Sequence, residues 1–405
     1  MKQFIVVVLG VLFIGCSSDA DKSTSNKKID FYFNEAYNTN LSNQQRLKYV
    51  DSALIIVEKQ NNNDTLKTKN YFKVANRYFM LLEYEKYKEV TKKILKKSES
   101  ESDTLSVAKA EYYLGDYYFA KSKNDSAYYY FLSAEKKYKT INDKSNLANT
   151  ILHKAYILLY EKDFLGSETE TIRVLNIANE INDNSLIYEC YVNLGSSLLG
   201  LGNFKKALDY HLKALEKIES VEDKNYHSIL RAQTYNNIGF VYLSMNQFDD
   251  AIKNFSLGLK IENIKNLHLV LYTALLDNYA YSNFKNKTSS DEKDFIESLK
   301  IRDSINDVAG KVNSRIHLTE YYLSQKDTSK ALQYNEEANR LAKESKYNKE
   351  VLQTLDFYTQ LKPKEGLKYA KEYIKLSDSL QQQERLTRNK LARIEFETDE
   401  IIVEK

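Results

Sequence analysis

Hydrophobic and small residues recur along this chain with the spacing of amphipathic helices, and the whole pattern repeats about every 40 residues. Small or key positions fall in one register at Ala75, Gly115, Ala155, Gly195, Gly239, Ala280 and Thr319. A second small residue often follows twelve residues later, at Ala127, Ser167, Ala207, Ala251 and Ala331. A repeat of this length is typical of helical hairpins that stack, because each hairpin leaves an apolar face for the next to cover.

The clearest copies of the repeat are residues 191–218 and 235–261, with a third at 112–138. Gly or Ala on each helix lets the two helices approach closely, while large apolar residues at helical spacing fill the seam. These segments resemble tetratricopeptide repeats. In the first copy, the residues that match the first helix of the repeat are Tyr191, Leu194, Gly195 and Leu198. The residues that match its turn and second helix are Phe204, Ala207, His211 and Ala214.

Three departures from the tetratricopeptide pattern are visible. The period exceeds the usual length of about 34 residues, and no Pro ends the second helix, so longer turns or longer helices are expected. Thr171 and Asn335 stand where an aromatic residue is expected.

Composition supports a helical chain. There are 1 Pro and 11 Gly in 405 residues, and both are unfavourable inside helices. We expect an all-α, right-handed α-solenoid of seven or eight hairpins over residues 31–376, followed by a charged, extended connector helix over 377–405. Pro363 is expected at the permissive first turn of a helix.

The N-terminus carries an apolar run from Phe4 to Ile14, which spans roughly 16 Å as a helix and is too short to cross a bilayer. Together with Gly15 and Cys16 it resembles a bacterial lipoprotein signal. The resemblance implies cleavage after residue 15, lipidation of Cys16 (palmitate included) and attachment to a membrane of the cell envelope. An ordinary cleaved signal with a chance cysteine is the alternative. Residues 16–30 are small and polar and are expected to form a flexible tether.

Little in the sequence indicates chemistry. The formal net charge is +3, too small for a nucleic-acid footprint. The five histidines show no metal-ligand spacing, and no catalytic motif is present, so we expect no metal, no cofactor and no enzyme. Residues 200–203 (GLGN) are expected to form the turn between two helices. His211 and Cys190 are expected to pack in the core.

In tetratricopeptide proteins the inner surface of the first helices binds peptides, with Asn and basic side chains holding main chain or carboxylates. The resemblance therefore implies a protein- or peptide-binding surface here, although the same residues could instead pack a tight superhelix. The candidate residues are Lys69, Asn76, Lys109, Tyr112, Asp116, Asn149, Tyr156, Ser196, Asn236 and Phe240.

The C-terminal segment RNKLARIEFETDEI (388–401) resembles a junction in repeat-containing sensors of Bacteroidota. In those proteins an exported repeat domain is followed by a membrane span and a helix-turn-helix or kinase-type output. Two functions follow. The chain is a lipid-anchored binding scaffold without enzymatic activity, or it is the sensory half of a signalling regulator whose membrane and output parts lie elsewhere.

Overall fold

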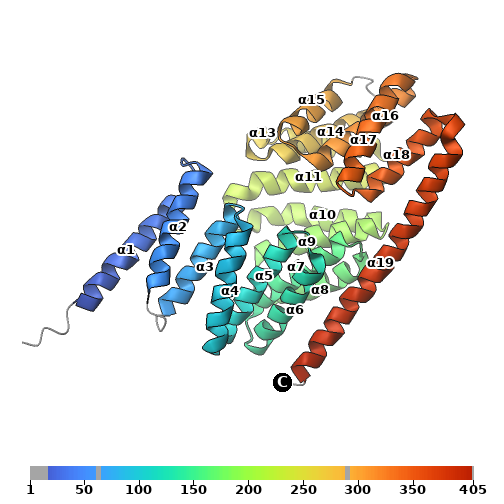
Figure 1. The fold of residues 1–405 in the computed structure, drawn as a ribbon. Coiled ribbons are helices and arrows are strands. Elements are labelled where there is room, and N and C mark those ends of the chain that lie inside the picture. Colours follow the sequence, from blue (N-terminus) through green and yellow to red (C-terminus); the bar gives the residue numbers. More distant parts are fainter. Residues whose placement is uncertain (1–16, 61–64, 288–291, 404–405) are drawn as a thin grey trace, which may run out of the picture. The chain divides into compact units, whose positions relative to one another are not determined.

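The computed structural model describes residues 17–60, 65–287 and 292–403, and throughout these ranges the regular structure is helical, with no strand. The chain forms two compact units, Met1–Ile141 (unit 1) and Asn142–Lys405 (unit 2). Consecutive helices pair as antiparallel hairpins in each unit (Figure 1). The fold is the predicted α-solenoid of tetratricopeptide-like hairpins.

Unit 1 contains three hairpins. Their helices are α1 (Ser17–Tyr37), α2 (Asn43–Lys59), α3 (Thr65–Met80), α4 (Tyr84–Ser100), α5 (Thr104–Ala120) and α6 (Asn124–Thr140).

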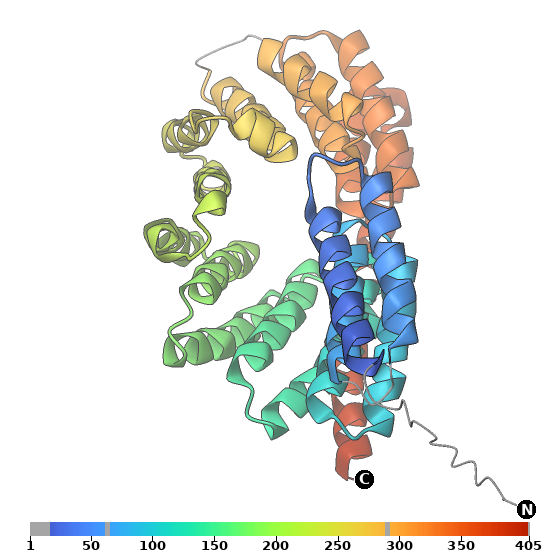
Figure 2. The same ribbon diagram turned by 90° about the vertical axis from the view of Figure 1, so that its left-hand side faces the viewer.

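Unit 2 contains six hairpins, which follow one another along a curve in Figure 2 (green to orange, with the last helix in red). The first four use α7 (Lys144–Tyr160), α8 (Phe164–Glu180), α9 (Asn184–Gly200), α10 (Phe204–Lys217), α11 (His227–Ser244), α12 (Phe248–Leu259), α14 (Leu269–Lys285) and α15 (Lys293–Ser304). The last two use α16 (Val308–Ser324), α17 (Thr328–Glu344), α18 (Asn348–Leu361) and α19 (Gly366–Val403). Short helices η1 (Ile218–Ser220), η2 (Lys224–Tyr226), α13 (Ile264–Leu267) and η3 (Pro363–Glu365) lie between them.

The period of 40 residues comes from long helices rather than long turns. From α5 to α9 each helix has 17 residues, and each connection between them has three, so one helix and one turn take 20 residues. A hairpin with its two turns therefore takes 40. The nine hairpins of the described residues exceed the seven or eight predicted, because α1 pairs with α2 and α19 pairs with α18.

Each three-residue turn has a common construction. Its middle residue adopts a left-handed conformation, as at Asn182 (φ 56°) and Gly202 (φ 74°), which reverses the chain at once. Its last residue usually caps the next helix by accepting a hydrogen bond from a backbone N–H near the start of that helix. These caps include Asp103, Asp143, Asp163, Asp183, Asn203, Asp307 and Asp327. The predicted turn at 200–203 is confirmed.

The register predicted from small residues is also confirmed, since all of its positions are buried. Three of them are glycines whose missing side chain is filled by a ring sixteen residues later. A Cβ on Gly115 would lie 2.5 Å from the ring of Phe131, and one on Gly195 would lie 2.5 Å from the ring of His211. The ring of Phe255 covers Gly239 in the same way. His211 is therefore a core residue, as predicted, and burial lowers its pKa to about 4.

Where the first helix carries a larger residue than glycine, the second helix carries a smaller partner than a ring. Ala75, Ala155 and Thr319 are followed sixteen residues later by Thr91, Thr171 and Asn335, all fully buried. This explains the two missing aromatic residues. Two of these polar side chains form hydrogen bonds: Asn193 Nδ2 donates to Thr171 Oγ1 (2.6 Å), and Asn335 Nδ2 donates to the carbonyl of Thr354 (3.1 Å), while Asn335 Oδ1 is buried without a partner.

The two ends of the chain differ from the prediction in detail. The tether was predicted over 16–30, but α1 begins at Ser17, because nothing in this segment breaks a helix and Ile29 and Phe33 are buried in the core of unit 1. The signal segment 1–15 and Cys16 lie outside the described residues. At the other end η3 begins with Pro363, as expected, and α19 continues through residue 376 without a break. In the part of the chain described here, no helix is both long and apolar enough for a membrane span.

The glycine–ring contacts predict a compensating pair of substitutions. Gly115→Ala should lower the free energy of unfolding by about 1–3 kcal/mol, because the new methyl group overlaps the Phe131 ring. This loss outweighs the gain from the better helix propensity of Ala. Phe131→Thr should cost about 3 kcal/mol through the cavity it leaves. The double variant copies the natural Ala155–Thr171 pair and should be more stable than the sum of the two losses implies. Urea unfolding of all four proteins measures this, and additive losses would contradict it.

Candidate peptide-binding groove

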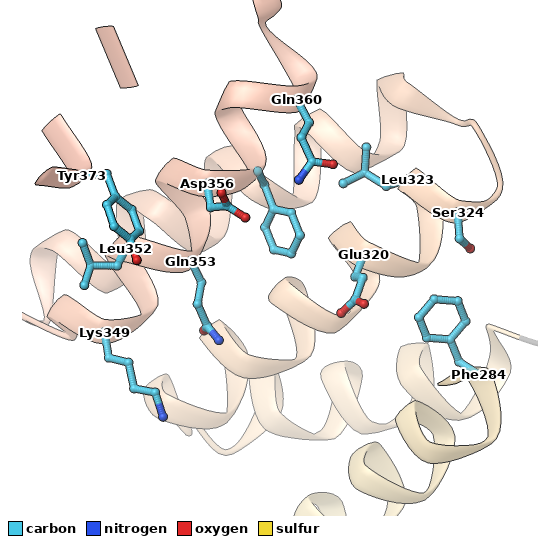
Figure 3. Close-up of a pocket in the computed structure, with 11 residues that line it drawn as sticks. Phe284, Glu320, Leu323, Ser324, Lys349, Leu352, Gln353, Asp356, Gln360 and Tyr373 are labelled. Atoms are coloured by element: carbon cyan, nitrogen blue, oxygen red, sulfur yellow. The ribbon is translucent and has the colours of Figure 1, made fainter. Parts of the chain in front are cut away.

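The first helices of the last four hairpins of unit 2 line two adjoining hollows. One, of about 490 Å³, lies over α11, α14, α16 and α18, and the other, of about 910 Å³, lies between α14, α16, α18 and the start of α19. They share four lining residues, Glu320, Lys349, Gln353 and Phe357. We call the continuous surface the α11–α18 groove; Figure 3 shows the larger hollow.

The wall of the groove combines aromatic and amide side chains. Phe240 is exposed in the smaller hollow, and Phe284 and Tyr373 line opposite ends of the larger one (Figure 3). Asn278 Nδ2 donates to Asn236 Oδ1 (3.1 Å), so an oxygen and an NH₂ group of this pair stay available. Such a wall suits a ligand with apolar side chains and a polar backbone.

A charged network lies beneath the floor of the smaller hollow. Asp277, on α14, is 1% exposed and accepts a hydrogen bond from Ser314 Oγ (2.7 Å). The buried Arg302, on α15, approaches the same carboxylate at 3.3 Å and also donates to Ser314 Oγ. His317 Nδ1 lies 2.7 Å from the other carboxylate oxygen of Asp277. Burial alone would raise the pKa of Asp277, but its interactions with His317 and Arg302 lower it to about 2.

A second pair of charges borders this network. Tyr281 donates its hydroxyl hydrogen to Glu320 Oε2 (2.7 Å), and Lys285 pairs with Glu320 Oε1 (2.8 Å). Burial, and then the Glu320 carboxylate, raise the pKa of the Tyr281 hydroxyl. The carboxylates of Asp277 and Glu320 are thus each matched by a cation of the protein.

The predicted residues of unit 1 form a separate group. Lys69, Asn76 and Lys109 line a cavity of about 410 Å³ between α3 and α5, beside Phe72. Lys109 lies over the Phe72 ring (4.7 Å), and burial lowers its pKa. Two further candidates of α5 do not line this cavity. They are Tyr112, whose ring packs on Phe131, and Asp116, whose pKa burial raises to about 8.

Five predicted residues lie in unit 2. Asn236 and Phe240 line the α11–α18 groove. Asn149 and Ser196 donate to carbonyls of their own helices, and Tyr156 donates its hydroxyl hydrogen to Glu189 (2.9 Å) across α7 and α9. The peptide-binding role of all ten candidates stays a prediction.

Most of the groove was missed from sequence, although the signal was present. Seven of the ten candidates stand three before or one after the register position of their repeat, on a helix face that also includes the position four after it. Around Ala280 and Thr319, these three offsets give lining residues of the groove: Asp277, Tyr281, Phe284, Ile316, Glu320 and Leu323. The later repeats match the tetratricopeptide pattern poorly, and for that reason no candidate was predicted on their inner faces.

Comparison with known proteins supports this architecture. A family model of the tetratricopeptide repeat matches residues 186–261. The chain is 24% identical over 245 residues to response regulator aspartate phosphatase I of Bacillus subtilis (strain 168), which covers 58% of this chain. The match spans 60% of the length of that relative.

Solved structures give the same fold at low identity. The apo form of RapI has a TM-score of 0.61 and 20% identity, covering 89% of this chain and 98% of its own. The Rap conjugation gene regulator of the plasmid pLS20, in complex with the Phr* peptide, has a TM-score of 0.57 and 13% identity. The match covers 89% of this chain and 95% of the regulator.

The buried network predicts an acid-sensitive loss of stability. The pKa of Asp277 is about 2, below its ordinary value, so its contribution is present above about pH 4 and is lost as the pH falls toward 2. Asp277→Asn should lower the free energy of unfolding at neutral pH by about 3 kcal/mol, since it leaves Arg302 buried without its carboxylate. It should also flatten the dependence of stability on pH between about 4 and 2.

Denaturant unfolding across this pH range measures the effect of Asp277→Asn. The exposed Asp250→Asn is the matched control and should change stability by less than about 0.5 kcal/mol. Equal losses for the two variants would contradict a role of the Asp277 network in stability.

Proposed function

We propose that this protein is a peptide-binding repeat scaffold without enzymatic activity, and that its ligand lies in the α11–α18 groove. The observation that carries the proposal is a row of carboxamides across the groove. Each of its four first helices contributes at least one: Asn236, Asn278, Asn313 and Gln353. Asn313 and Gln353 are exposed and have no hydrogen-bond partner among the described residues.

The row has the dimensions of an extended peptide. Packed helices lie about 8–10 Å apart, so three steps from α11 to α18 cover about 24–30 Å, and up to about 30 Å is available to a ligand. An extended chain rises about 3.3 Å per residue, and this distance corresponds to about nine residues. A carboxamide both donates and accepts, so it can bind the main chain of a peptide whatever its sequence.

The structural relatives support the same function. The pLS20 regulator, with a similar fold, was solved with a peptide bound. The Bacillus subtilis relative is named a phosphatase, but we assign no catalytic role to this chain, because the Asp277 carboxylate at the groove floor is buried and already paired with Ser314 and Arg302.

We further propose that the scaffold is exported and attached to a membrane of the cell envelope through lipid on Cys16. The lipoprotein-like segment, Phe4 to Ile14 with Gly15 and Cys16, supports this. Because α1 begins at Ser17, the lipid would join directly to a helix of unit 1.

The alternative is that the chain is the sensory half of a membrane-linked regulator. The contacts of α19 favour this alternative. Tyr373, on α19, lines the larger hollow, and farther along the same helix Glu384 forms an ion pair with Lys162 (2.8 Å). A ligand in the hollow would therefore touch a continuous helix that leads toward the C-terminus.

Selection from a display library of random nine-residue peptides tests the groove. Peptides that bind the wild-type protein should bind the Gln353→Ala and Asn313→Ala variants about 2- to 12-fold more weakly, the range of one hydrogen bond. Phe240→Ala should weaken binding about 10-fold. Fluorescence anisotropy measures the affinities.

Gln247→Ala, which changes an exposed amide outside the groove, is the matched control and should bind like the wild type. If no peptide is selected, or if the groove variants bind like this control, the groove is not the binding site. Dephosphorylation of a phosphorylated response regulator by the purified protein would contradict the absence of enzymatic activity.

The anchor has its own test. Cys16→Ala should abolish incorporation of labelled palmitate and move the protein from the membrane fraction to the soluble fraction. Cys190→Ala is the control, because Cys190 is buried and burial raises the pKa of its thiol. Retention of Cys16→Ala on membranes would overturn the anchor.

A further inference from the structure

His317 is held in one orientation on the floor of the smaller hollow. Its ring stacks on that of Tyr281, with centroids 4.0 Å apart and planes 15° apart, and the ring of Phe295 approaches it at 6.3 Å. Nδ1 lies 2.7 Å from Asp277 Oδ2. A partial turn of the ring would break the stacking, and a half-turn would take Nδ1 away from Asp277.

The neighbours of His317 determine which ring nitrogen carries the proton. Asp277 is ionised at neutral pH, accepts a hydrogen bond from Ser314 and forms an ion pair with Arg302. Its carboxylate oxygens therefore have no proton to donate. Nδ1 must then be the donor in the contact with Asp277. In a neutral imidazole the other nitrogen, Nε2, is consequently an acceptor.

Nε2 faces the groove. It has no hydrogen-bond partner among the described residues, and it is not among their buried unpaired atoms, so it is accessible from the hollow that His317 lines. The surrounding charges are balanced. Asp277 pairs with Arg302 and Glu320 pairs with Lys285, and the positive Lys349 is next to the negative Glu350 on α18.

We propose that Nε2 of His317 selects the ligand of this groove by accepting a hydrogen bond from a neutral donor, a peptide N–H or a hydroxyl. The proposal rests on the peptide-binding function above. The balanced charges give no excess negative charge to attract an ammonium or guanidinium group, so a neutral donor fits this point better than a cation.

Two substitutions separate selection from structure. In His317→Asn the side-chain Nδ2 stands where Nδ1 stood and can still donate to Asp277, but the acceptor at the ε position is gone. In His317→Gln an amide group reaches the ε position instead. His317→Asn should bind a selected nine-residue peptide about 3- to 10-fold more weakly than the wild type, with a urea midpoint no lower than that of His317→Gln, which loses the same ring contacts. His317→Gln should recover part of the affinity.

The donor on the peptide is found by N-methylating each main-chain position in turn and by replacing each Ser or Thr with Ala. One such change should weaken binding to the wild type and have little further effect on His317→Asn, as expected for two groups that interact. A main-chain donor and a hydroxyl donor are distinguished by which series contains that change. Additive losses at every position would overturn the proposal, whereas failure to select any peptide would instead refute the peptide-binding function.

Long-range ¹H–¹⁵N NMR of the ligand-free protein tests the proton position independently. At about pH 9 the neutral ring should show the proton on Nδ1 and a lone pair on Nε2, and the Nε2 shift should change when the peptide is added. A proton on Nε2 in the neutral ring would overturn the proposal even if peptides bind.

Discussion

The close contact between the two helices of a hairpin determines most of this structure. A ring on the second helix rests on the backbone of the first, where a glycine has no side chain, as Phe131 rests on Gly115. Opposite Ala75, Ala155 and Thr319 the partner is instead Thr or Asn, so a larger residue on the first helix is offset by a smaller one on the second. This contact holds the two helices in register. Each first helix consequently turns the same face inward, at the same offsets from the contact.

The regular spacing of this contact along the chain explains which features could be predicted from the sequence and which could not. Small residues at a steady interval were enough to identify the hairpins, their buried positions, the core role of His211 and the turn at 200–203. The helix that begins at Ser17 was missed because polar composition suggested a tether, while helix propensity and the packing of Ile29 favoured continuation. Local composition is weak evidence where tertiary contacts decide.

Most of the candidate site was missed for a different reason. Asn236 and Phe240 follow from the register, but the relation of His317 to Asp277 joins residues 40 positions apart on neighbouring first helices. Neither residue carries a recognisable motif. Their roles arise from burial, which keeps the Asp277 carboxylate away from water, and from stacking on Tyr281, which orients the imidazole ring. Both conditions exist only after the hairpins have packed.

The three-residue turns have a consequence for how such a chain can change in length. A turn that reverses the chain with one left-handed residue and one cap has no spare residue, so an added amino acid would have to enter a neighbouring helix, where it rotates the rest of that helix by about 100°. Viable length changes between α5 and α9 are therefore confined to whole helices or whole hairpins. The link from α10 to α11 is the contrast: η1 and η2 occupy it, and the register there lengthens to 44 residues without disturbing the helices on either side. Evolution of this protein would accordingly proceed by duplicating hairpins and by elaborating the few long links, and the turns themselves would tolerate substitution but not insertion.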